Sequence, residues 1–120
     1  MKNFVHFYND PDENRFIIAS VNIEGNKSHP IQDFLRGDIQ IGVESCIDCL
    51  NQIHQAKENI DYFYDSFGNC CTITVTHKGV TIENEYTEDT TEDIKLDDME
   101  IILEKWLEFI KTRQPIEYSW

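Results

Sequence analysis

Runs of β-branched and aromatic residues, several of which alternate strictly between apolar and polar positions, predict five β-strands along this chain. The predicted strands cover Asn3–Tyr8, Arg15–Ile23, Asp61–Ser66, Cys71–His77 and Val80–Tyr86. Groups of Asn, Asp, Gly and Pro separate neighbouring strands, as at Asn9–Asn14 and Phe67–Asn69, and such groups are typical of tight turns. Consecutive strands joined by such turns pair as hairpins, so the sheet they form is expected to be antiparallel.

A second pattern, with apolar residues recurring every three or four positions, predicts two amphipathic helices. The first runs from about Gln40 to Lys57. The second begins at Asp97, a suitable N-cap with Glu100 three residues later as in a capping box, and Pro115 ends it. A short helical turn is also expected at Ile31–Arg36, and Ile116–Trp120 is expected to be a tail that packs back on the domain.

The predicted element order is β-β-α-β-β-β-α within one domain, residues 1–120. The fold class is therefore α+β, with an antiparallel sheet of about five strands and two amphipathic helices packed on one of its faces. The other face carries Thr and Glu, so it is expected to meet either solvent or a partner.

Negative charge is concentrated in one part of the chain. The formal net charge is −13, and ten acids lie between Glu83 and Glu104 with Lys95 as the only base among them. Such a surface repels nucleic acid and anionic membranes and attracts basic proteins, although it can also serve only to keep the protein soluble. We predict that the partner-binding residues are Glu83, Glu85, Tyr86, Glu88, Asp89, Glu92, Asp93, Asp97 and Asp98.

The four cysteines are the first candidates for chemistry. Cys46 and Cys49 have the spacing of a redox pair, but a redox pair belongs at a helix N-terminus, and here the predicted helix places them inside it as buried thiols. Cys70 and Cys71 would complete a zinc site only if neighbouring strand residues pointed to the same face, which they normally do not. We expect Cys71 on the same face as Thr72, unless Cys70 still belongs to the turn.

The remaining titratable residues form no motif. His6, His29, His54 and His77 are scattered, and no phosphate loop, nucleophile elbow or metalloprotease motif is present. We therefore expect no catalytic, cofactor-binding or metal-binding residues and no enzymatic activity.

The location is inferred from two further features. No apolar run is long enough for a transmembrane helix, and the N-terminal residues become polar too early for a signal peptide. We therefore expect a cytoplasmic protein whose cysteines stay reduced.

Size, acidity, the α+β layout and a C-terminal helix with the sequence LDDMEIILEKWLEFIKTRQP give the chain a family resemblance. It resembles the small bacterial immunity proteins that neutralise the toxin domains of contact-dependent growth inhibition and related polymorphic toxin systems. The resemblance implies a protein that binds one toxin, often a nuclease, and blocks its active site or substrate groove.

Two alternatives remain open at this point. The first is a homodimeric adaptor or scaffold that pairs through an exposed strand edge such as Val80–Tyr86. The second is a small metal or redox protein that uses the cysteines. The sequence does not decide the oligomeric state.

Overall fold

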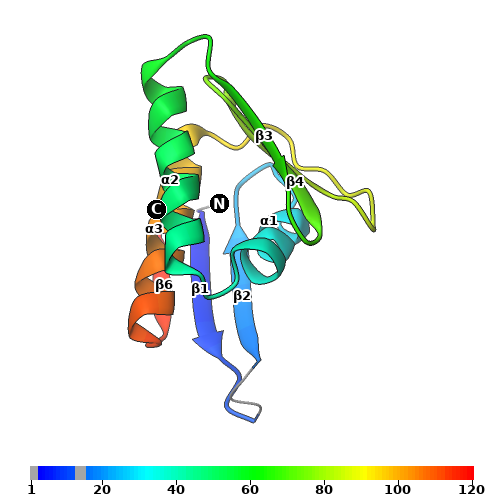
Figure 1. Cartoon of the computed structure of the whole chain (residues 1–120). Helices are drawn as coiled ribbons and strands as arrows, with labels where there is room; N and C mark the ends of the chain where they lie inside the picture. The colour runs from blue at the N-terminus through cyan, green and yellow to red at the C-terminus, as the bar shows by residue number, and fades with distance from the viewer. Residues whose placement is uncertain (1–2, 13–15) are drawn as a thin grey trace.

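The computed structural model describes residues 3–12 and 16–120 (Figure 1). Its elements are β1 (Phe4–Asn9), β2 (Ile17–Asn22), α1 (His29–Phe34), the π-helical turn η1 (Leu35–Ile39), α2 (Val43–Glu58), β3 (Phe63–Phe67), β4 (Cys71–Thr76), β5 (Gly79–Asn84), α3 (Leu96–Thr112) and β6 (Ile116–Ser119). Part of the predicted turn Asn9–Asn14 and the first residue of the predicted strand Arg15–Ile23 fall outside the described residues.

The strands form two antiparallel sheets of three strands each, in the orders β2-β1-β6 and β3-β4-β5. The α+β class and the antiparallel pairing are confirmed, but the prediction of one five-stranded sheet is wrong. Two features account for the difference. The predicted tail is strand β6, which pairs with β1 so that Val5 lies opposite Tyr118, and the helical segment between β2 and β3 separates the two groups of strands (Figure 1).

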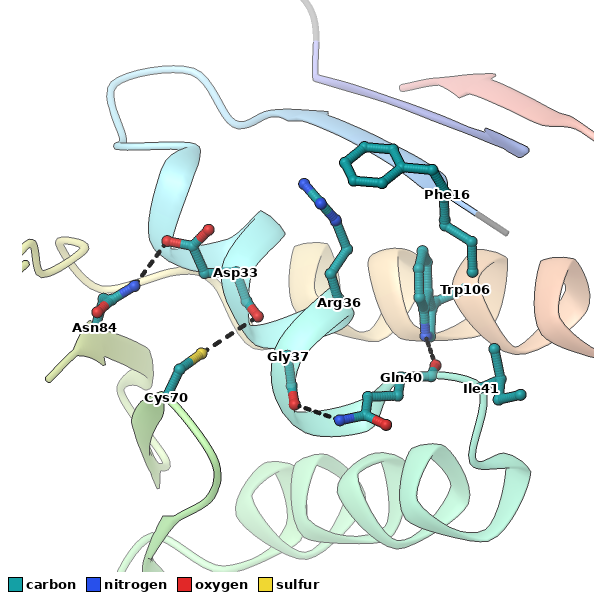
Figure 2. Close-up of a pocket in the computed structure, with 10 residues that line it drawn as sticks. Phe16, Asp33, Arg36, Gly37, Gln40, Ile41, Cys70, Asn84 and Trp106 are labelled. Atoms are coloured by element: carbon teal, nitrogen blue, oxygen red, sulfur yellow. Dashed lines mark hydrogen bonds between the residues drawn. The ribbon is translucent and has the colours of Figure 1, made fainter. Parts of the chain in front are cut away.

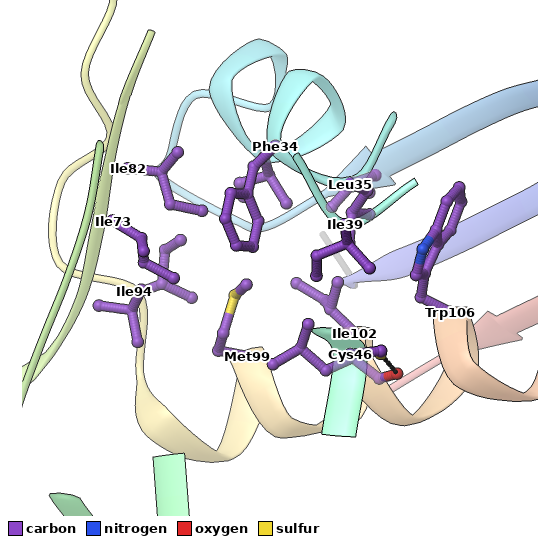
Figure 3. Close-up of a cluster of buried hydrophobic side chains, with 14 of the residues drawn as sticks. Phe34, Leu35, Ile39, Cys46, Ile73, Ile82, Ile94, Met99, Ile102 and Trp106 are labelled. Atoms are coloured by element: carbon purple, nitrogen blue, oxygen red, sulfur yellow. Dashed lines mark hydrogen bonds between the residues drawn. The ribbon is translucent and has the colours of Figure 1, made fainter. Parts of the chain in front are cut away.

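One hydrophobic core joins the two sheets. Helix α1 contacts β2 of one sheet and β4 and β5 of the other, while α2 packs along α3 and α3 contacts β1, so the prediction of two helices on one face of a single sheet is also wrong. Ile73, Ile82 and Met99 are among the core residues that Figure 3 shows pointing toward one another. The ring of Phe7 meets Trp106 edge-on with centroids 4.9 Å apart, a favourable geometry for aromatic pairs.

The helical path that starts at α1 continues through Gly37 to Ile39, further than the predicted turn Ile31–Arg36. It ends because Gln40 has a positive φ of 55°, and the Gln40 N–H donates to the Leu35 carbonyl at 2.8 Å, five residues back. The predicted helix start at Gln40 is therefore wrong: α2 begins at Val43, after a turn. The ends of helices are where sequence patterns are least specific.

Helix α3 begins at Leu96, with Lys95 rather than Asp97 in the N-cap position and without a side-chain cap. The prediction of Asp97 as N-cap is wrong because its carboxylate reaches Lys57 Nζ at 2.6 Å instead of the helix backbone. The neighbouring Asp98 carboxylate accepts a hydrogen bond from the indole of Trp120 at 2.9 Å. Both acids lie in the first turn of α3, where negative charge interacts favourably with the helix dipole and stabilises the helix.

Within the part of the chain that the structure describes, no helix is both long and apolar enough to cross a membrane.

Candidate protein-binding face

The outer face of the β3-β4-β5 sheet combines acidic and aromatic side chains. In an antiparallel ladder, directly opposed residues share a face. One row across the three strands is Phe67, Thr72 and Glu83, and the next contains Asp65. The opposite face carries Ile73, which is buried in the core. We call the outer surface the acidic–aromatic face and define it as Phe63, Asp65, Phe67, Thr72, Thr74, Thr76, Thr81, Glu83 and Glu85, with Tyr86 in the turn beside it.

Three aromatic side chains on or beside this face are largely open to solvent. Phe63, Phe67 and Tyr86 are 66%, 61% and 77% exposed. Isolated exposed apolar residues are common on proteins, but aromatic residues are enriched in binding interfaces relative to the rest of the surface. The face therefore offers apolar anchors as well as charge.

Short local contacts position the residues that follow the C-terminal end of β5. The Thr72 hydroxyl donates to the Glu85 carboxylate at 2.5 Å, which holds Glu85 over the sheet although β5 ends one residue earlier. The Asn84 side-chain oxygen accepts the backbone N–H of Tyr86 at 2.8 Å. The Tyr86 hydroxyl in turn donates to the Asn69 carbonyl at 3.3 Å, so the ring lies across the β3–β4 turn.

The other predicted partner-binding acids do not lie on the strands of this face. Glu88 and Asp89 are exposed in the turn after β5, where Asp89 is 3.6 Å from Lys27 Nζ. Glu92, Asp93 and Asp98 line a separate depression of about 400 Å³ near the loop after β2. The sequence cluster thus separates into two groups in space.

Asp97 belongs to neither group. Lys57 Nζ contacts the carboxylates of Asp97 and of Glu100 at 2.6 and 2.8 Å. The hydrogen bonds from Lys57 lower the pKa of both carboxyl groups, and these carboxylates raise the pKa of Lys57. Lys78 and Lys95 line the same depression as Asp97, so its charge is locally balanced.

Sequence reasoning missed Phe63, Asp65 and Phe67. The sequence pattern predicted a strand at Asp61–Ser66. Aromatic residues occur on both faces of this strand, however, so the pattern does not show which face is buried. The register with β4 settles the orientation, because Tyr64 lies opposite the buried Val75.

The strand edge proposed for pairing is already occupied. Val80 and Glu83 of β5 form bridges to Ile94 and Thr90, so the edge at Val80–Tyr86 is not open. Among the described residues, β3 pairs with β4 alone, and its other edge is the open edge of this sheet.

A pocket of about 610 Å³ lies where η1, α3 and the start of β2 meet (Figure 2). The Arg36 guanidinium lies over the Phe16 ring, 4.8 Å from its centre. Asp33 accepts a hydrogen bond from the Asn84 amide at 2.9 Å. Cation, carboxylate and aromatic ring each have a partner, and the lining residues present no nucleophile paired with a base.

The first cysteine pair has the environment expected of core thiols. Cys46 is fully buried and its thiol donates to the Leu103 carbonyl at 3.4 Å, while Cys49 is partly buried. Burial raises the pKa of both thiols to about 12. Thiols of this kind are poor nucleophiles because little thiolate forms at neutral pH.

The second pair contradicts the first expectation made for it and confirms the stated alternative, that Cys70 belongs to the turn. Cys71 lies on the buried face with Ile73 rather than with Thr72. Cys70 precedes β4 and belongs to the turn, so its side chain is free to point toward Cys71, and the two sulfur atoms are 3.2 Å apart. Burial raises the pKa of both thiols.

The described histidine contacts are separate from one another. His54 contacts Glu100 at 2.7 Å, and His77 contacts the Ala56 carbonyl at 2.8 Å. The His6 ring packs against the ring of Tyr8, and both residues belong to β1 in the β2-β1-β6 sheet. These three histidines therefore each contact a different part of the described structure.

Comparisons of the chain with protein-family models, with curated proteins and with solved structures gave no match.

Proposed function

We propose that this protein is a cytoplasmic binding domain that neutralises a basic protein through its acidic–aromatic face, in the manner of an immunity protein acting on a nuclease toxin. It acts by occupying the partner's substrate groove and not by catalysis. The observation that carries the proposal is the placement of Asp65, Glu83 and Glu85 on one sheet face together with three exposed aromatic rings.

Physical chemistry supports this assignment in two ways. A nuclease groove holds phosphates with Arg and Lys, and carboxylates on a rigid sheet can take the same charge-assisted hydrogen bonds. Charge mainly accelerates the encounter, whereas buried aromatic residues slow dissociation. Phe63, Phe67 and Tyr86 are suited to the second role because they lie beside the carboxylates and are exposed.

The test uses a charge-reversal pair and a matched control. Glu83→Lys with Glu85→Lys changes the net charge by the same amount as Glu58→Lys with Glu104→Lys, whose exposed carboxylates lie on α2 and α3. Each variant is co-expressed in a bacterium with a candidate basic nuclease toxin domain that the parent protein neutralises in the same assay. We expect the control to protect growth as well as the parent protein, and the face variant to lose protection and to bind the toxin at least a hundredfold more weakly.

The outcome that would overturn the proposal is equal protection by the two variants. A further pair, Phe63→Ser with Phe67→Ser, separates anchoring from charge, and it should accelerate dissociation more than it slows association. RNA and DNA integrity in the unprotected cells would identify the toxin's substrate.

The open edge of β3 favours a second candidate function, self-association as a homodimeric scaffold. Antiparallel pairing of β3 with its own copy, centred on Asp65, would place two carboxylates opposite each other, which is unfavourable. Sizing the pure protein at two concentrations separates the candidates, because a monomer at both would exclude the scaffold.

A further inference from the structure

We propose that Cys70, Cys71 and Asp38 form a binding site for a thiophilic divalent cation of the Zn²⁺ type, a site that is independent of the acidic–aromatic face. The two thiol sulfurs and one carboxylate oxygen all lie within 4.8 Å of one another. Thiolate and carboxylate are both common zinc ligands, and three protein ligands with a fourth position left for water make a recognised type of zinc site.

Close packing of the β3–β4 turn against η1 brings these groups together. The Asp38 carboxylate accepts the backbone N–H groups of Cys70 and Cys71 at 2.9 and 3.1 Å, one on each oxygen. Each carboxylate oxygen has a second lone pair, so these hydrogen bonds orient the group without using its capacity to bind a metal. The carboxylate is thus fixed beside the sulfurs.

Two glycines make this approach possible. A Cβ atom at Gly37 would lie 2.8 Å from Cys70 Sγ, and one at Gly68 would lie 2.7 Å from the Asp38 carboxyl carbon. Neither approach leaves room for a side chain. Figure 2 shows Gly37 and Cys70 on facing segments, with the Cys70 sulfur directed at the Asp33 carbonyl.

The geometry favours a bridging metal over a disulfide. Neighbouring Cα atoms are about 3.8 Å apart, below the roughly 4.4–6.8 Å that disulfides normally span. Two thiolates on a tetrahedral zinc ion, with Zn–S bonds of about 2.3 Å, lie about 3.8 Å apart. The sulfurs are 3.2 Å apart. A small rotation of the partly buried Cys70 side chain that moves its sulfur by a fraction of an ångström accommodates the ion.

The ion can reach the site from either side. Cys71 and Asp38 line a pocket of about 240 Å³ between η1, α2 and β4, and Cys70 lines the 610 Å³ pocket of Figure 2. Binding converts two thiols to thiolates and releases two protons to solvent, with no change in oxidation state.

The experiment is a titration of the reduced full-length protein with Cd²⁺, a spectroscopic substitute for Zn²⁺, followed by competition with Zn²⁺. We expect one equivalent to bind with the ultraviolet band of cadmium–thiolate bonds. Cys70→Ser and Cys71→Ser should each weaken binding at least tenfold, and Asp38→Asn severalfold. Cys46→Ser and Cys49→Ser are the matched controls and should leave the affinity unchanged.

Two outcomes would overturn the proposal: no stoichiometric binding, or binding that survives in Cys70→Ser and is lost in Cys49→Ser. Cadmium NMR of the parent protein gives a test that does not depend on how the variants fold. A chemical shift typical of two sulfur ligands with oxygen supports the site, and a shift typical of four sulfurs or of oxygen alone contradicts it.

Discussion

Two tryptophans in this protein each donate one indole hydrogen bond, but to different acceptors and in different surroundings. The Trp106 indole is fully buried and donates to the Gln40 carbonyl at 2.9 Å, while the Trp120 indole is half-buried and donates to Asp98, also at 2.9 Å. Net stabilisation by a hydrogen bond is modest, but a buried acceptor that loses its donor carries the full desolvation cost. The two positions separate these effects.

We expect Trp106→Phe to lower the free energy of unfolding by about 2–3 kcal/mol, because it leaves a cavity beside Phe7 and removes the donor to the Gln40 carbonyl. Trp120→Phe should cost roughly 0.5–1 kcal/mol, because water can replace its hydrogen bond. Urea unfolding followed by circular dichroism measures both. Equal losses would show that burial of the indole does not decide its contribution.

At the level of single residues, sequence identified burial better than orientation. The apolar stripe correctly marked Cys46, Met99 and Trp106 as core. The buried face of Cys71 follows from strand alternation, since β4 begins at Cys71 as predicted and Cys71 shares a face with Ile73, so the expectation of the Thr72 face was a misreading of the pattern. The contact of Cys70 and Cys71 with the Asp38 carboxylate could not be predicted, because Asp38 is distant in sequence. A shift of one residue in a strand start reverses every facing side chain.

Between helices, Lys57 of α2 joins Asp97 and Glu100 of α3. Lys57 lowers the pKa of both carboxyl groups below their ordinary values of 3.8 and 4.5. A group whose pKa is lower in the folded state stabilises the fold above its ordinary pKa, and the stabilisation disappears as the pH falls through the folded pKa. This contact therefore stabilises the protein at neutral pH and is lost below about pH 4.5.

We expect Lys57→Met to lower the free energy of unfolding at pH 7 slightly, mainly through the lost contact with Glu100, since Asp97 is largely exposed to solvent and exposed ion pairs contribute little. At pH 3 the difference from the parent protein should be much smaller. Thermal melting across this pH range measures the effect. Lys105→Met is the control, because Lys105 is 3.9 Å from Glu108 and should show little pH dependence. A Lys57 effect that is constant with pH would contradict this account.

At the level of elements, periodicity located helices and strands but not their partners. The strands β4 and β5 and the helix α3 were found within a few residues, because their patterns are local. The pairing of β6 with β1 joins the two ends of the described chain, and no local pattern encodes it. The division into two sheets follows from that pairing and from the helical segment between β2 and β3.

Across the whole molecule, the acidic cluster in the sequence was only partly a cluster in space. Glu83 and Glu85 share one face because they are two residues apart along and just after β5, and Tyr86 lies in the turn beside them. Asp97, although close in sequence, pairs with Lys57 on a different element. Phe63 and Phe67 come from β3 and join the face through the sheet register, so sequence proximity to the acids could not reveal them.

The net charge of −13 acts on folding and on binding with opposite signs. Like charges held close together in the folded state repel, and added salt screens this repulsion, with a Debye length of about 30 Å at 0.01 M and 10 Å at 0.1 M. Attraction to a basic partner is screened by the same ions. Salt should therefore stabilise the free protein and slow its association.

We expect the free energy of unfolding to rise by roughly 1 kcal/mol between 0.01 M and 0.2 M NaCl, a shift of several degrees in melting temperature. Over the same range the association rate with the basic partner should fall at least tenfold, while the dissociation rate changes little. The control variant Glu58→Lys with Glu104→Lys carries less net negative charge and should therefore show a smaller effect of salt on the melting temperature. The same variant should keep the salt dependence of association, because it leaves the acidic–aromatic face intact. If both salt effects fell together in this variant, long-range net charge rather than the face would govern the encounter.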